Sequence, residues 1–265
     1  MTSLLASDMD GTVIPLEDTP RRRAELVEFR EAVEESDDLI LAYVTGRRLA
    51  LAEKGMGQFR LPGPDFLVCD VGTSVFRAGP NGFELDGEYA RRMRVAMDGV
   101  DFKEVRRLLE GIEGLDLQPD ERQTEFKLSY HLPGESRPGF AVSAVRARLE
   151  GLEGSVQAVY SVGAPSGIGL LDLLPKGAAK DSALRYLKEV TEVEDEHIVY
   201  AGDSGNDLAA LLAGFNAIVV ANAGSELKEE LSARELDGAD LSRVFFSNHP
   251  FAKGVLEGCR HFGML

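Results

Sequence analysis

The feature that most constrains the fold is a short apolar run near the start of the chain that ends in two acids. Leu4-Leu5-Ala6 is typical of a buried strand, and Ser7-Asp8-Met9-Asp10-Gly11-Thr12 follows it directly. Two carboxylates placed where a strand gives way to a glycine turn would both lie at the end of a parallel sheet, where open α/β folds hold their chemistry. The alternative is that Asp-Gly-Thr is only an ordinary turn.

Two further apolar runs continue the pattern. Apolar positions on one face predict a helix over residues 21–35, and residues 38–44 predict a strand that ends in Thr45-Gly46-Arg47. Residues 65–69 predict a third strand, which leads into Asp70-Val71-Gly72-Thr73. Strands that alternate with helices indicate a parallel sheet with right-handed crossovers.

From about residue 73 the pattern changes, because hairpins replace the alternation. We expect a hairpin at 73–77 and 83–85, a helix near 105–109, a strand at 124–132, a helix at 140–149 and strands at 155–162 and 168–174. Afterwards the α/β alternation resumes, with helices at 180–190 and 251–262 and strands at 197–201 and 217–221. The fold class is therefore α/β. We expect a Rossmann-like parallel-sheet core of residues 1–83 and 173–265, with an inserted α+β cap domain at 84–172.

The chain is acidic, with 29 basic and 45 acidic residues and a formal net charge of −16. Such a protein repels polyanions and anionic membranes, so we expect neither nucleic acid nor a membrane as a partner. No apolar run approaches the roughly 20 residues that span a bilayer, and the start of the chain does not resemble a signal peptide. We therefore expect a cytoplasmic protein whose partner is a small molecule.

Polar groups follow four of the expected strands: Asp8 with Asp10, Thr45 with Gly46, residues 70–73, and Asp203 with Asp207. In a parallel sheet these strand ends lie along one edge, which argues against a turn alone at Asp8. Gathered carboxylates repel one another unless a cation lies between them, and oxygen ligands of this kind suit Mg²⁺. The set indicates phosphoryl transfer, with one aspartate as nucleophile and the other as proton donor and acceptor.

Each of these residues also has a purely structural interpretation. Thr45 is suited to cap a helix that begins near Arg47. Residues 204–207 have the spacing of a capping box, with Asp207 in the place of the usual Glu or Gln. Lys180 opens a helix, where a lone lysine is usually a solvated charge.

Taken together, the motifs resemble those of the haloacid dehalogenase superfamily of phosphatases. The resemblance implies that Asp8 is the nucleophile and Asp10 the acid/base, and that Thr45, with the Gly46 backbone beside it, binds phosphate. It implies further that Lys180 steadies the phosphoryl group, with Lys176 as the competing candidate. Mg²⁺ would be held by Asp8, Asp10, Asp203 and Asp207, with Asn206 next to them at the phosphate.

A closer resemblance, over nearly the whole length, is to the sucrose-phosphate phosphatases. It is carried by residues 41–47, Lys127-Leu128-Ser129-Tyr130-His131-Leu132 and residues 172–175. By position it implies that Lys127 and His131, on one face of one strand, contact the sugar, with Gly72 and Thr73 below them. The sequence departs from the pattern at Thr124 and Phe126, where Asn and Trp are expected, and in the 163–169 loop.

The resemblance implies a Mg²⁺-dependent hydrolase that converts sucrose 6-phosphate to sucrose and phosphate through an aspartyl-phosphate. We expect it to act as a monomer, with cap hinges near residues 83 and 172. The alternatives are another disaccharide phosphate such as mannosylfructose phosphate, a sugar phosphomutase, or a sugar-phosphate-binding protein without activity. A dinucleotide oxidoreductase is disfavoured, since no Gly-x-Gly-x-x-Gly follows the first strand, and no Walker-type loop is present.

Overall fold

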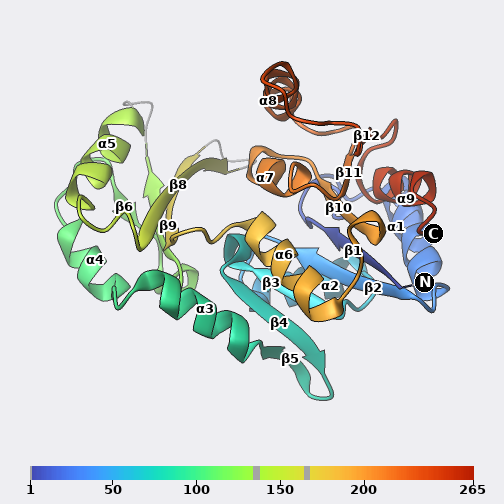
Figure 1. Cartoon of the computed structure of the whole chain (residues 1–265), viewed down its shortest axis with the longest axis horizontal. Coiled ribbons are helices and arrows are strands. Elements are labelled where there is room, and N and C mark those ends of the chain that lie inside the picture. Colours follow the sequence, from blue (N-terminus) through green and yellow to red (C-terminus); the bar gives the residue numbers. More distant parts are fainter. Residues whose placement is uncertain (1, 134–137, 164–167) are drawn as a thin grey trace. The chain divides into compact units, whose positions relative to one another are not determined.

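A computed structural model describes residues 2–133, 138–163 and 168–265 (Figure 1). The chain forms two compact units, one made of Met1–Asp86 with Ala179–Leu265 and the other of Gly87–Ala178. Residues 164–167 of the 163–169 loop lie outside the described residues. Among the helices of the described residues, none combines the length and the apolar character that crossing a membrane requires.

The first unit is built on an eight-stranded sheet of order β12-β11-β10-β1-β2-β3-β4-β5. Its strands are β1 (Ser3–Ser7), β2 (Leu39–Val44), β3 (Phe66–Cys69), β4 (Ser74–Gly79), β5 (Gly82–Leu85), β10 (Ile198–Gly202), β11 (Asn216–Val219) and β12 (Val244–Phe246). The six strands from β12 to β3 pair in parallel, and β4 and β5 add an antiparallel hairpin at the edge. The α/β class predicted from the alternating pattern is confirmed.

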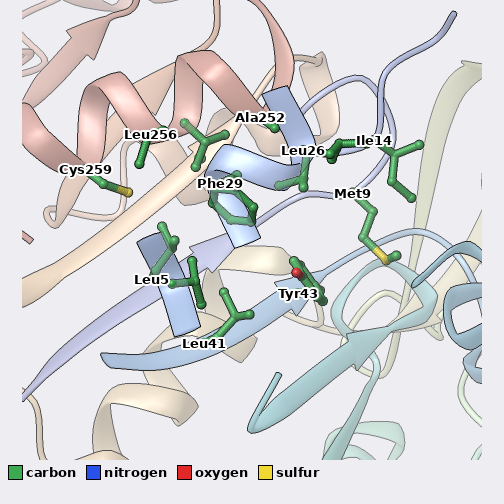
Figure 2. Packing of buried hydrophobic residues seen from close by; sticks show 14 of the residues in the cluster. Leu5, Met9, Ile14, Leu26, Phe29, Leu41, Tyr43, Ala252, Leu256 and Cys259 are labelled. Atoms are coloured by element: carbon green, nitrogen blue, oxygen red, sulfur yellow. The ribbon is translucent and has the colours of Figure 1, made fainter. Parts of the chain in front are cut away.

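The helices of this unit are α1 (Pro20–Glu34), α2 (Leu49–Phe59), α6 (Lys180–Thr191), α7 (Leu208–Leu211), α8 (Ser225–Leu236) and α9 (Phe251–His261). One face of the sheet packs against α1, α2 and α9, as Figure 2 shows in part, with Leu5 and Leu41 beneath Phe29 and Leu256. Strand residues alternate between faces, so Tyr200 lies on the opposite face, where α6 and α7 pack.

The position of β1 inside the sheet determines where the candidate functional residues lie. β1 pairs with β2 on one side and with β10 on the other. The chain therefore runs outward from β1 in one direction before the second unit and in the other direction after it. Open α/β sheets bind ligands at such a switch point, beyond the carboxyl ends of the strands.

The second unit has an antiparallel sheet of order β6-β7-β9-β8. Its elements are α3 (Gly87–Met97), α4 (Phe102–Leu108), β6 (Asp116–Leu117), β7 (Leu128–Leu132), α5 (Pro138–Arg148), β8 (Val156–Gly163) and β9 (Ile168–Pro175). Hairpins mixed with helices were expected in this part of the chain. Helix α3 was not predicted as a separate element.

The prediction that a strand begins at Thr124 is wrong, because β7 begins at Leu128. Residues 124–127 form a tight turn closed by one bridge between Thr124 and Lys127. The Gln123 side chain braces this turn, since its amide accepts a hydrogen bond from the Ser129 N–H and donates to the Ser129 carbonyl. Lys127 therefore precedes the strand, and the two-residue period that was expected to place it on one strand face with His131 does not apply.

Candidate active site

The site is built from the loops that follow β1, β2 and β10 and from the first turn of α6. The Asp8 N–H donates to the Ala201 carbonyl at 2.9 Å, which fixes the end of β1 against β10. Asp8 is buried, with 5% of its surface exposed. The nucleophile candidate therefore stands on rigid backbone between two paired strands.

Lys180, the first residue of α6, is fully buried and lies between two carboxylates. Its Nζ is 2.7 Å from Asp8 Oδ1 and 2.7 Å from Asp207 Oδ1. A buried ammonium is stable only with such partners, because taking a charge out of water is costly. The structure thus brings together three of the residues singled out in the sequence. Lys176, the competing lysine, is exposed.

Asp207 is held by donors from several directions. The Tyr200 hydroxyl donates to its Oδ1 at 2.6 Å, and the N–H groups of Asp203 and Ser204 donate to its Oδ2 at 3.2 and 3.0 Å. The capping box expected at residues 204–207 is present. Asp207 therefore combines a capping role with a direct contact to Lys180.

Asp203 faces the loop after β1. Its Oδ1 accepts a hydrogen bond from the Thr12 hydroxyl at 2.7 Å. Gly11 has a φ of 82°, and a Cβ at this position would come within 2.4 Å of Asp203 Oδ2. The Asp10-Gly11-Thr12 turn therefore packs against the Asp203 carboxylate. The turn is a part of the site.

The titration of these groups reflects burial and mutual charge. Burial raises the pKa of the Asp8 carboxyl to about 8, although the Lys180 ammonium opposes this shift. Burial and the Asp207 charge raise the pKa of Asp203 to about 6. Burial also opposes ionisation of Asp207, yet the Lys180 ammonium and the Tyr200 hydroxyl hold the pKa of that carboxyl below its usual value.

The acidic group is suited to a divalent cation. One oxygen from each of Asp8, Asp203 and Asp207 lies within 4.8 Å of the others. Among the described residues, the Lys180 ammonium faces these three carboxyl groups, so if all three are ionised two negative charges remain to be balanced in a largely buried place. Carboxylate oxygens are the ligands that hard cations prefer. Such a cation fits the residues present.

Asp10, expected among the metal ligands, lies outside this acidic group as found within the described residues. Its carboxylate is instead clamped by Arg47, with Nε to Oδ2 at 2.6 Å and Nη2 to Oδ1 at 2.5 Å. The Asp10 side chain is 47% exposed, in contrast to buried Asp8. The two acids of the opening motif therefore occupy different environments.

Thr45 lies at the end of β2 and is 1% exposed. The prediction that it caps a helix beginning near Arg47 is wrong, because α2 begins at Leu49 and Arg48 is the cap residue. The Thr45 Oγ1 instead accepts a hydrogen bond from the Arg47 N–H at 3.1 Å. This hydrogen bond closes the Thr45–Arg47 loop, which lies next to β3.

The other candidates differ in their surroundings. Thr73 is fully buried and donates its hydroxyl to the Asp70 carbonyl at 3.0 Å, and Asn206 is exposed. In the second unit Lys127 is buried, while His131 is half-buried on β7 opposite Asp116. The roles given to these residues stay predictions.

Two residues of the site were not selected from the sequence. Tyr200 was passed over because it lies within the buried strand Ile198–Gly202, although a hydroxyl in an otherwise apolar strand is a signal in itself. In the sequence Arg47 stands out only as the residue after Thr45-Gly46. Its pairing with Asp10 joins residues 37 positions apart, which a local pattern does not reveal.

Comparison with known proteins identifies the family of the chain. The family model of sucrose-6F-phosphate phosphohydrolase matches residues 1–263. A protein of Nitrosococcus oceani described as a HAD-like hydrolase is 34% identical, over 98% of this chain and 71% of its own length. The mannosylfructose-phosphate phosphatase of Agrobacterium fabrum is 30% identical, over 98% of this chain and 97% of its own length.

Among solved structures, the sucrose-phosphatase of Synechocystis in complex with sucrose and phosphate matches with a TM-score of 0.81. It is 28% identical, and the match covers 99% of both chains. The acidic group around Lys180 thus occurs in a chain whose full length follows one phosphatase fold, with its core sheet and its separate antiparallel unit. The protein is a phosphohydrolase of the haloacid dehalogenase type and belongs to the sucrose-6F-phosphate phosphohydrolase family.

Proposed function

We propose that this protein is a Mg²⁺-dependent sugar-phosphate phosphatase that hydrolyses sucrose 6-phosphate through a phosphorylated Asp8. The observation that carries the proposal is the fully buried Lys180, whose Nζ lies 2.7 Å from both Asp8 and Asp207. Phosphoryl transfer needs fixed positive charge beside a fixed nucleophile, since its transition state spreads negative charge over the equatorial oxygens. Membership of the phosphohydrolase family supports the same reaction.

In the first step an Asp8 carboxylate oxygen attacks phosphorus, and the bond between phosphorus and the sugar oxygen breaks. Asp10 gives its proton to the departing sugar oxygen. The Asp10 side chain is 47% exposed, so it can exchange protons with water, and it would leave its pair with Arg47 when it carries the proton.

In the second step water attacks phosphorus, Asp10 takes a proton from that water, and the bond from phosphorus to Asp8 breaks. Phosphate leaves and the Asp8 carboxylate is regenerated. Lys180 and the Thr45 hydroxyl, with the Gly46 backbone and Asn206 beside them, bind the phosphoryl oxygens in both steps.

Asp8, Asp203 and Asp207 would hold the metal ion through carboxylate oxygens, and when bound Mg²⁺ neutralises charge on the phosphoryl group. The three carboxylates carry more negative charge than Lys180 alone balances, which supports a divalent cation at this place. Asp10, with its side chain on Arg47, would not supply a carboxylate oxygen in this arrangement.

The unit Gly87–Ala178 would act as the cap that selects the sugar. The role rests on its being a separate compact insertion between two halves of the catalytic unit. Lys127 and His131 are proposed sugar contacts, and closure of the cap would exclude bulk water from the phosphoryl group.

Mannosylfructose phosphate is a second candidate substrate. The observation in its favour is the 30% identity with the mannosylfructose-phosphate phosphatase over nearly the full length of both proteins. The departures from the sucrose-phosphate phosphatase pattern at Thr124 and Phe126 also lie next to Lys127.

The test is phosphate release with Mg²⁺ from sucrose 6-phosphate, mannosylfructose phosphate, glucose 6-phosphate and fructose 6-phosphate, with no bisphosphate added. We expect kcat/KM to be highest for sucrose 6-phosphate. A higher value for mannosylfructose phosphate would select the second candidate. Equal values for all four would contradict recognition of a disaccharide, and turnover only after a sugar bisphosphate is added would indicate a phosphomutase.

A further inference from the structure

The segment Asp70–Gly72, directly after β3, has an unusual backbone. Three successive residues have positive φ: Asp70 at 54°, Val71 at 62° and Gly72 at 96°. A β-branched residue such as Val71 rarely adopts this conformation, which is strained and persists only where the surroundings impose it. Strain of this kind is concentrated at functional sites.

On one side the segment is bonded to the loop that carries Thr45. The Val71 N–H donates to the Thr45 carbonyl at 3.1 Å, and the Asp70 N–H donates to the Arg47 carbonyl at 2.9 Å. The Val71 Cγ2 lies 3.8 Å from the position that a Cβ on Gly46 would occupy. The conformation of the segment therefore fixes the backbone on both sides of Gly46.

On the other side the segment contacts the start of α6. A Cβ on Gly72 would lie 2.3 Å from the Ala179 carbonyl oxygen and 2.8 Å from the backbone nitrogen of Lys180. Both the positive φ and the close approach require glycine at this position. Gly72 thus sets the distance between β3 and the residue whose ammonium lies between Asp8 and Asp207.

We propose that Asp70–Gly72 is a spacer that holds the phosphate-binding loop Thr45–Gly46 and Lys180 at a fixed separation, with Val71 and Gly72 as positioning residues. This inference rests on the proposed function. It differs from the expectation that Gly72 and Thr73 bind the substrate below Lys127 and His131, because a Cβ on Gly72 would meet the backbone at the start of α6 and the Thr73 hydroxyl donates to the Asp70 carbonyl. The spacer acts on the phosphoryl end of the substrate whatever the sugar is.

The test is Gly72→Ala, with Gly214→Ala as the matched control. Gly214 has a φ of 95°, nearly that of Gly72, but a Cβ there meets nothing within 4 Å. Both variants place alanine at nearly the same positive φ, and only Gly72→Ala must displace the start of α6. We measure kcat and KM for the preferred sugar phosphate and for p-nitrophenyl phosphate, together with inhibition by inorganic phosphate, after confirming folding by circular dichroism.

We expect Gly72→Ala to lower kcat by about 100-fold on both esters, since a displacement of about 1 Å in a catalytic group has an effect of this order. Inorganic phosphate should also inhibit more weakly, which a mere loss of folded protein would not produce. Gly214→Ala should keep the wild-type values. A loss confined to KM for the sugar phosphate would show a sugar contact and overturn the inference, as would unchanged kcat and phosphate inhibition.

If Gly72→Ala does not fold, Val71→Gly takes its place, because glycine removes the Val71 side chain beside Gly46 and gives the segment backbone freedom that a spacer of fixed length does not tolerate. It should lower kcat on both esters by a common factor and weaken phosphate inhibition, and wild-type values would overturn the inference. Failure of the proposed function is a separate result. A wild-type enzyme that hydrolyses p-nitrophenyl phosphate but no sugar phosphate would contradict the proposed substrate class and leave the spacer test intact.

Discussion

At the scale of single residues, the site is defined by an excess of negative charge around one ammonium. Asp8, Asp203 and Asp207 converge here, and the Lys180 ammonium balances only part of their negative charge. The overall charge of the chain does not attract anions, since its formal net charge is −16. Affinity for an anionic phosphoryl group must therefore come from local groups, namely Lys180, backbone N–H groups and a bound cation.

Tyr200 offers a direct test of how Asp207 is held. Its hydroxyl donates to a buried carboxylate, and a hydrogen bond to a charged group contributes about 1.5–3 kcal/mol. We expect Tyr200→Phe to lower the free energy of unfolding by this amount and to reduce kcat, because Asp207 also positions Lys180. Urea denaturation and steady-state kinetics measure the two effects.

The matched control is Tyr43→Phe. Tyr43 is also fully buried, but its hydroxyl donates to the neutral Pro62 carbonyl at 3.2 Å. We expect this change to cost about 0.5–1.5 kcal/mol and to leave kcat unchanged. Equal losses of stability and activity in the two variants would contradict a specific role for Tyr200.

The sequence was sufficient to select most of the residues that meet in the site, because each follows a strand in the same parallel sheet. Asp8, Asp203 and Asp207 could be placed together from topology alone, and Lys180 from its place in the motif order. The hydrogen-bond partners of these side chains could not be predicted, since they depend on rotamers and on packing across the sheet. The clamp of Arg47 on Asp10 is such a case.

At the scale of elements, glycines decide how closely helices approach the sheet. Gly258 lies on the buried face of α9, and a Cβ there would come within 2.4–2.9 Å of three atoms of the Ile218 side chain on β11. Ile218 is fully buried and cannot move into solvent. The helix therefore packs against the sheet at a distance that only glycine permits.

We expect Gly258→Ala to destabilise the protein by about 1–3 kcal/mol, the usual cost of overpacking a core, even though alanine favours the helix. Gly57→Ala in α2 is the control, because that glycine is exposed and a Cβ there meets nothing within 4 Å. It should stabilise by about 0.5–1 kcal/mol. Urea denaturation that gave both changes the same sign would contradict this account of the packing of α9.

The elements themselves could be predicted where one face or both faces are apolar. The strands of the parallel sheet are short apolar runs, and α6 begins at Lys180 as expected. The start of β7 could not be predicted, because residues 124–127 resemble a strand and are turned by the side chain of Gln123. Helix α3 was within reach of the sequence, because its buried residues Tyr89, Met93 and Met97 recur every four positions with arginines between them.

At the scale of the whole molecule, the acidic group links stability to pH and to metal. The pKa values of Asp8 and Asp203 in the folded, metal-free protein are raised from 3.8 to about 8 and about 6. A carboxyl whose pKa is raised by folding stabilises the fold below its unfolded pKa, and this contribution is lost as the pH rises through the folded pKa. Titration of these two groups therefore lowers the stability of the metal-free protein progressively as the pH rises from about 4 to about 8.

Asp207 acts in the opposite sense: because folding lowers its pKa, its stabilising contribution is present above its unfolded pKa of about 3.8 and is lost only as the pH falls below that value. We therefore expect MgCl₂ to raise the melting temperature more at pH 8 than at pH 5, because the ligands must be deprotonated to bind the metal. Differential scanning fluorimetry measures the increment, and Asp203→Asn should reduce it at pH 8. An increment that is the same at both pH values would contradict a carboxylate metal site.

Asp8, as the group that accepts the phosphoryl group, is central to the proposed reaction. The most direct measurement is the rate of phosphate release from sucrose 6-phosphate with Mg²⁺ by the wild type and by Asp8→Asn, with Asp18→Asn, an exposed aspartate paired with Arg23, as the control. We predict release by the wild type and the control and none above background by Asp8→Asn, with unchanged circular dichroism. Substantial turnover by a folded Asp8→Asn variant would contradict the account.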